Sequence, residues 1–199
     1  MRNFRTSRLF DVLFLLCLGG VLVAAFVYRV AIGDWVFFQT HEPSNRTVSI
    51  ASAANLTPSA TRLLYRGDPQ FVDATTISDV CSFEQLGCLT EKGQIFVLDD
   101  PANPDQSTVT AVHEMLHLAY RRLSDSEKAG LTSDINQQLV NSQLQQELRE
   151  YAPGEEQLDE AHAILGTEFA DLPAGLESYY ETYFIDRHQI VSVYQTSIQ

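Results

Sequence analysis

The pentapeptide His113-Glu114-Met115-Leu116-His117 constrains the fold of this chain more than any other feature of its sequence. It lies in a segment that starts at a capping residue, Ser107, and reaches Arg122 or Leu123 without a proline, which predicts a helix. Apolar residues recur at helical spacing on one face of this segment, at Val109, Val112, Leu116 and Tyr120. We therefore expect a helix with one buried face.

The spacing of the two histidines favours a zinc site. Residues four apart lie on the same face of a helix, so the imidazoles of His113 and His117 can reach a single Zn²⁺. Glu114 lies about 100° around the helix from His113, beside the ion, where it can take a proton from metal-bound water. The alternative is a buried histidine pair beside a surface glutamate.

HEMLH on a predicted helix, with a strand before it and acidic helical segments after it, resembles the zincin metallopeptidases. The metzincin pattern is absent, because Leu118 to Leu123 follow His117. The resemblance is therefore to the gluzincin branch, in which a glutamate on a later helix supplies the third zinc ligand. It implies a small zincin-like α+β domain that hydrolyses bonds in a protein or peptide substrate, with Zn²⁺ as cofactor and Glu114 as general base.

The third zinc ligand is expected between residues 155 and 172. The candidates there are Glu160, His162, Glu168 and Asp171. If this segment is one helix, Glu168 lies in an apolar stripe, where a carboxylate requires compensation for its desolvation, and a metal supplies it. We expect His113, His117 and Glu168 to bind the zinc, and Glu160 to be solvated. His162 also faces inward and is either a ligand, a hydrogen-bond partner or a core histidine. The resemblance gives Asp171 the role of orienting a metal-binding histidine.

Donors for the oxyanion of the reaction are sought on the last helix, at Tyr179, Tyr180, Tyr183 and His188. The tyrosines belong to an aromatic and aliphatic face that is more typical of a core. The resemblance places the strand Gly93–Leu98 beside the cleft, where it can bind an extended peptide by strand addition.

The N-terminal stretch Leu9–Tyr28 is apolar except for Asp11, and 20 residues span roughly 30 Å, the thickness of a bilayer core. Arginines precede it, at Arg2, Arg5 and Arg8, which retains that end in the cytoplasm. We expect a transmembrane signal anchor within residues 1–35, a juxtamembrane stalk over 36–56, and a domain over 57–199 outside the cytoplasm. The alternative is a signal peptide cleaved near Val23-Ala24-Ala25, which leaves a secreted domain.

Charge and cysteines agree with an exported protein. Asp and Glu total 26 against 13 Lys and Arg, a net charge of −13 that argues against nucleic-acid binding. Cys81 and Cys88 lie in the exported part, where such a pair usually forms a disulfide. Cys17 lies within the apolar stretch and is expected to be a small apolar filler.

The remaining pattern predicts an α+β domain with a short sheet and four to five helices. Thr57-Pro58 begins a helix to about Tyr65, Phe71–Ile77 is β-prone, and Gly93–Leu98 is a strand. The capping box Ser124–Glu127 opens a long helix to about Tyr151, and further helices follow over Glu155–Leu172 and Ala174–Tyr194. Two other functions remain open: a non-catalytic zinc-binding interaction module, and a structural zinc whose fourth ligand is His162.

Overall fold

The computed structural model describes residues 14–23, 25, 27–81 and 85–199. The chain divides into two units, Met1–Glu42 and Pro43–Gln199. The first contains helix α2 (Arg29–Thr40), in which no residue is buried. The ring of Phe37 stacks on that of His41, the residue after this helix, with the ring centroids 4.2 Å apart.

The expected transmembrane helix over Leu9–Tyr28 is not supported. Within the described ranges, no helix has both the length and the apolar character needed to cross a membrane. Helix α2 has 12 residues and contains Arg29 and Asp34. Residues 9–13 and the three arginines before them lie outside the described residues.

The second unit begins with three short helices, each started by a polar side chain. They are α3 (Asn45–Ala53), α4 (Pro58–Gly67) and α5 (Ala74–Val80), with Ser44, Thr57 and Asp73 as their N-caps. The Thr57-Pro58 start is confirmed. The β-prone reading of 71–77 is wrong beyond Val72, because the Asp73 carboxylate accepts the Thr76 N–H at 2.8 Å and begins a helix there.

The sheet has three strands in the order β1-β3-β2: β1 (Gln70–Val72), β3 (Ile95–Leu98) and β2 (Gly87–Leu89). Strand β1 is parallel to β3, and β2 is antiparallel to it with Cys88 opposite Phe96. The expected strand Gly93–Leu98 exists as β3, but it is central and paired on both sides, so no peptide can add to it. The predicted disulfide Cys81–Cys88 is confirmed and links β2 to the end of α5.

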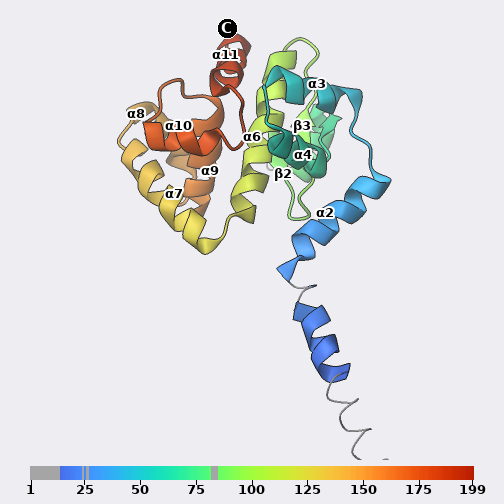
Figure 1. Cartoon of the computed structure of the whole chain (residues 1–199). Coiled ribbons are helices and arrows are strands. Elements are labelled where there is room, and N and C mark those ends of the chain that lie inside the picture. The colour runs from blue at the N-terminus through green and yellow to red at the C-terminus, as the bar shows by residue number, and fades with distance from the viewer. Residues whose placement is uncertain (1–13, 24, 26, 82–84) are drawn as a thin grey trace, which may run out of the picture. The chain divides into compact units, whose positions relative to one another are not determined.

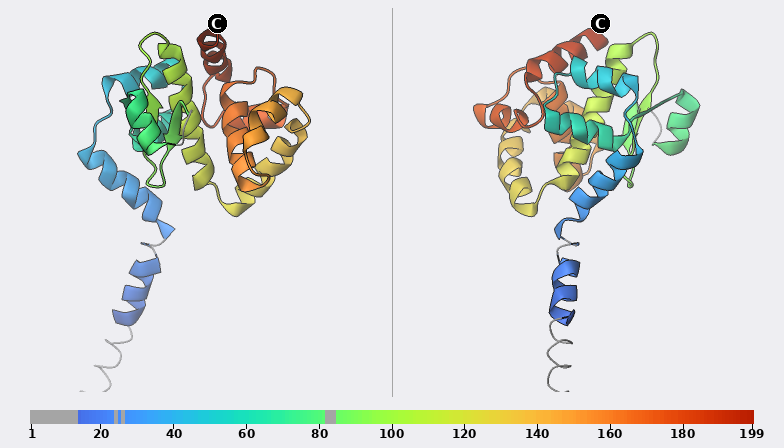
Figure 2. Two further views of the ribbon diagram at one scale, coloured as in Figure 1. Left: turned by 180° about the vertical axis from the view of Figure 1, so that it is seen from behind. Right: turned by 45° about the vertical axis from the view of Figure 1, so that its right-hand side comes forward.

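Helix α6 (Pro104–Arg122) lies between the sheet with α3 and α4 on one side and three later helices on the other (Figures 1 and 2). The later helices are α7 (Asp125–Gln138), α9 (Glu155–Thr167) and α10 (Ala174–Tyr180). It begins earlier than expected, because Asn103 rather than Ser107 caps it and Pro104 occupies its first turn. The Ser107 hydroxyl instead donates to the Leu98 carbonyl at 3.0 Å, which ties α6 to β3.

The helices after α6 are shorter and more numerous than expected. They are α7 (Asp125–Gln138), α8 (Ser142–Glu147), the 3-10 helix η1 (Leu148–Glu150), α9 (Glu155–Thr167), α10 (Ala174–Tyr180) and α11 (Arg187–Ser197). The capping box of Ser124 and Glu127 is confirmed. The expected long helix to Tyr151 ends at Gln138, and Asn141 caps a new one. An α+β domain of four to five helices is therefore corrected to a mainly helical unit with a small sheet.

Helices α6 and α9 approach each other closely at Gly166. A Cβ on Gly166 would lie 2.4 Å from Cδ1 of Leu116 and 2.9 Å from Cε1 of Tyr180, so any other residue there would displace these buried side chains. The end of α9 is held by Arg187, whose buried guanidinium donates to the carbonyls of Leu165, Phe169 and Ala170 and pairs with Glu177. These contacts fix the two helices that carry the site.

Candidate metal centre

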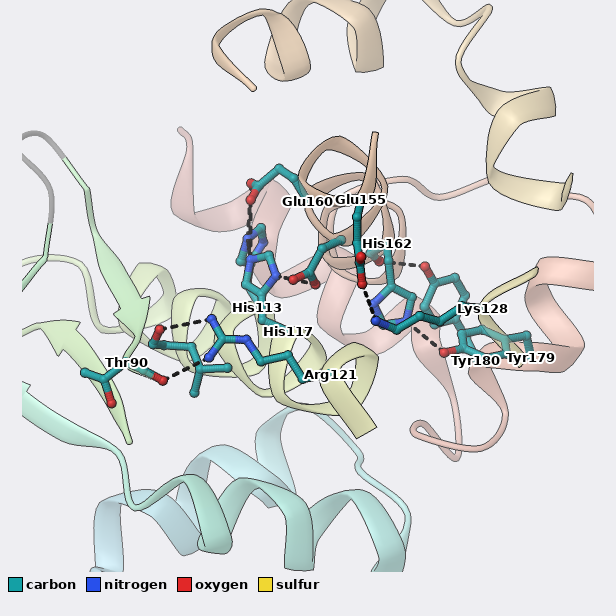
Figure 3. A network of polar contacts seen from close by, with 12 residues as sticks. Thr90, His113, His117, Arg121, Lys128, Glu155, Glu160, His162, Tyr179 and Tyr180 are labelled. Carbon is teal, nitrogen blue, oxygen red and sulfur yellow. Dashed lines mark hydrogen bonds and ion pairs between the residues drawn. The ribbon is translucent and has the colours of Figure 1, made fainter. Parts of the chain in front are cut away.

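The imidazoles of His113 and His117 meet at the surface of α6 that faces α9 (Figure 3). Their Nε2 atoms are 3.1 Å apart, and both side chains are mostly buried. The one-turn spacing predicted from the sequence thus produces two nitrogen atoms aimed at a common point.

Glu160 of α9 completes the group. Its Oε1 lies 3.3 Å from Nε2 of His113 and its Oε2 lies 3.3 Å from Nε2 of His117. Two zinc ligands at bond lengths of ~2.0–2.1 Å in a tetrahedron are about 3.3–3.4 Å apart, which is close to these separations. His113, His117 and Glu160 are therefore a group that could hold a metal ion.

The electrostatics of this group favour a positive charge at its centre. Burial lowers the pKa of His117, but hydrogen bonds to Asp159 and Glu160 outweigh it and raise this pKa to about 10. The pKa of His113 is also raised, because Glu160 outweighs the effect of burial. The two histidines in turn hold the pKa of Glu160 far below its usual value despite burial. The acidic side chains that favour these protons would also favour a cation bound in their place.

Asp159 orients His117 from outside the group. Its Oδ1 lies 2.8 Å from Nδ1 of His117. An ionised carboxylate only accepts hydrogen bonds, so the proton of a neutral His117 ring lies on Nδ1 and the Nε2 lone pair points toward Glu160. Asp159 is not among the site residues expected from the sequence. The signal available was its position directly before Glu160 on a helix that packs against the histidines.

Glu168, the expected third ligand, occupies a different place. Helix α9 ends at Thr167 and Glu168 is its C-cap, so the apolar stripe on which the expectation rested does not continue to Leu172. Its Oε1 lies 4.0 Å from Nδ1 of His113, on the far side of the ring from Nε2. The structure brings Glu160 to the Nε2 atoms, and the Glu160 side chain is only 13% exposed, contrary to the expected solvation.

Glu114 is buried beside the histidines, at 7% exposure. Burial raises its pKa, while the neighbouring His117 and His113 act in the opposite direction. Strand β2 passes close over it at Gly87, where a Cβ would lie 2.5 Å from Cγ2 of Thr110 and 2.7 Å from the Phe96 carbonyl oxygen. The same Cβ would lie 3.5 Å from Cγ of Glu114, so the edge strand β2 lies next to this side chain.

His162 is a hydrogen-bonded core histidine. Its side chain is fully buried, Nε2 lies 3.0 Å from the Tyr179 hydroxyl, and burial lowers its pKa to about 3. Tyr180 donates to its carbonyl at 2.6 Å, and the Tyr179 and Tyr183 hydroxyls are 3.2 Å apart. The three tyrosines proposed as oxyanion donors are therefore engaged around His162.

The other two residues singled out from the sequence lie in a separate surface pocket. Asp171 is exposed and lines that pocket together with His188, Glu177 and Arg187. The structure does not bring Asp171 or His188 into the His113, His117 and Glu160 group.

Tyr151, at the end of η1, approaches the group and was missed by the sequence analysis. Burial raises the pKa of its phenol, and a side-chain contact with Glu160 raises it further. Its phenol is therefore protonated beside the Glu160 carboxylate, and the charge of Glu114 also acts on it.

Comparison of the chain with protein-family models, curated proteins and solved structures found no match to any of them.

Proposed function

We propose that this chain is a zinc-dependent peptidase. One observation carries the proposal: Nε2 of His113, Nε2 of His117 and the Glu160 carboxylate converge, with the buried Glu114 carboxyl on the adjoining face of α6. A purely structural metal site has no use for a buried carboxyl group next to its ligands. The burial of Glu114 therefore favours catalysis over the alternative of a non-catalytic zinc-binding module.

The donor set suits zinc. Two imidazoles and one carboxylate are a common protein ligand set of catalytic zinc, which keeps a further position for water or substrate. His113, His117 and Glu160 would hold the ion, and Asp159 would keep the His117 ring in the binding tautomer. Bound zinc would supply Lewis-acid activation of water and polarisation of the substrate carbonyl.

Glu114 acts as the general base in this proposal. A carboxyl group whose pKa is raised by burial accepts a proton from water more readily than an ordinary glutamate does. The same group then donates the proton to the amine that leaves when the peptide bond breaks.

Tyr151 replaces Tyr179, Tyr180 and Tyr183 as the candidate oxyanion donor. Its protonated phenol contacts Glu160 and can donate a hydrogen bond to a carbonyl oxygen held near that carboxylate. An extended peptide would pair with the edge strand β2 rather than with the central β3. Arg121 holds the end of that strand, donating to the carbonyls of Leu89 and Thr90 (Figure 3).

The disulfide supports a working location outside the reducing cytoplasm. Cys81 and Cys88 are bonded, and such bonds persist in oxidising compartments. The substrate in this proposal is a protein or peptide present in that compartment.

The proposal is tested on the purified full chain by elemental mass spectrometry and by hydrolysis of a mixed peptide library. We expect about one zinc per chain, cleavage that a chelator abolishes and zinc restores, and no cleavage by Glu114→Gln. Zinc bound by a chain that cleaves nothing would support the interaction module instead. A chain that does not retain zinc after loading would refute both functions.

A further inference from the structure

A pocket of about 460 Å³ lies between the segment 139–153 and the first turn of α9. It is lined by Leu139, Gln145, Leu148, Arg149, Tyr151, Pro153 and Gln157. Tyr151 connects it to the site, since this residue lines the pocket and also contacts Glu160. Gln157 lies on α9 three residues before Glu160, about one turn along the same helix.

The lining contains one charged residue, Arg149. The Nε of Arg149 donates to the Gln146 carbonyl at 3.1 Å, which orients the guanidinium. Its two terminal nitrogens make no hydrogen bond or ion pair with the part of the chain that the structure describes. The positive charge of Arg149 lies at this pocket in a chain that has twice as many acidic as basic residues.

The walls match a particular ligand chemistry. Leu139, Leu148 and Pro153 are apolar, and Gln145 and Gln157 supply amide groups. A side chain with an aliphatic stem and a terminal carboxylate would bury the stem between the apolar walls and pair its carboxylate with the guanidinium. The pocket volume lies within the range usual for small-ligand sites.

We propose that this pocket is the specificity subsite of the peptidase and binds a substrate carboxylate through Arg149. The inference rests on the proposed peptidase function and adds the substrate class to it. The carboxylate comes either from a glutamate side chain next to the cleaved bond or from the C-terminus of the peptide.

The test uses the zinc-loaded full chain and matched peptides that differ in one group. In the first pair, one peptide has glutamate and the other has glutamine at a position next to the cleaved bond, and each such position is tested in turn. In the second pair, one peptide has a free C-terminus and the other an amidated C-terminus. We expect kcat/KM to be about fivefold higher for the charged member of one pair, the size of a solvent-accessible ion pair. A preference in the first pair identifies a side-chain carboxylate, and one in the second identifies a C-terminal carboxylate.

Variants of Arg149 make the result specific. Arg149→Gln should remove the preference, and Arg149→Glu should reverse it toward lysine, while the exposed Lys92→Gln should retain it. The same preference should appear in peptide binding to Glu114→Gln, measured by fluorescence anisotropy. Cleavage without a preference for either charged peptide would overturn the subsite and leave the peptidase standing. No cleavage of any peptide, with zinc bound, would overturn both.

Discussion

The Nδ1 atom of His117 lies 2.8 Å from the Oδ1 atom of Asp159, and this contact joins the metal-facing side of α6 to the first turns of α9. In the neutral ring the carboxylate holds the proton on Nδ1, so that Nε2 can bind a metal. We expect Asp159→Asn to weaken zinc affinity by about 10- to 100-fold, the usual effect of losing such a partner. Competition with a zinc chelator measures it. Unchanged affinity would show that the contact does not orient the ring.

The Glu160 and Glu168 carboxylates are expected to differ sharply in their effect on zinc. Glu160 lies 3.3 Å from both Nε2 atoms, whereas Glu168 lies 4.0 Å from Nδ1 of His113. Glu160→Ala should therefore lose stoichiometric zinc, and Glu168→Ala should retain it. Elemental mass spectrometry of the two dialysed proteins makes the comparison, each variant serving as control for the other. The reverse outcome would restore Glu168 as the third ligand.

Replacement of Glu114 is expected to separate activity from stability. Glu114→Gln removes the proposed base and should reduce kcat by about 10²- to 10⁴-fold with zinc content unchanged. Because burial raises the pKa of this carboxyl, its charged form is disfavoured in the fold, and the neutral amide should leave the melting temperature equal or higher. Differential scanning calorimetry and peptide hydrolysis give the two readouts. A variant that keeps full activity would exclude Glu114 as the base.

Zinc binding is expected to depend on pH through His117. In the metal-free protein its pKa rises from 6.5 to about 10, so its protonation stabilises the fold fully below pH 6.5 and this contribution is lost as pH rises through about 10. Zinc needs the neutral ring, so its apparent affinity should increase with pH across this window, by up to about tenfold per unit. Calorimetry in two buffers of different ionisation enthalpy should detect proton release. Affinity that is constant between pH 7 and 9 would contradict the shift.

The buried guanidinium of Arg187 is expected to be a large contributor to stability. It pairs with Glu177 and binds three carbonyls at the end of α9. Arg187→Met should lower the free energy of unfolding by about 3–5 kcal/mol, because it leaves a carboxylate and several carbonyls without their partner. Urea denaturation measures the loss. The matched change at the exposed Arg149, Arg149→Met, should cost less than about 0.5 kcal/mol.

The parts of the fold that local sequence determines could be predicted. HEMLH lies on a helix, Ser124 and Glu127 form their capping box, and Thr57 starts its helix as expected. In each case the side chains that fix the structure lie within a few residues of the backbone they bind.

The third member of the metal group could not be predicted, because it depends on contacts distant in sequence. Helix α9 ends at Thr167 since Arg187, 17 to 22 residues later, satisfies carbonyls near its end. The expectation that the helix and its apolar stripe continue to Leu172 is therefore wrong. Glu168 lies just after the end of the helix and not on one of its faces. Glu160 lies off that stripe, and its burial is compensated by two histidines of another helix, which periodicity does not reveal.

Gly166 provides no chemistry, yet it sets the separation between the helices that carry the metal group. A single methyl group there would overlap the side chains of Leu116, the residue before His117, and of Tyr180. The spacing of the candidate metal ligands therefore also depends on a residue that is not one of them. Transplanting only His113, His117, Asp159 and Glu160 into another scaffold would therefore copy these side chains without Gly166, which allows the two helices to pack closely.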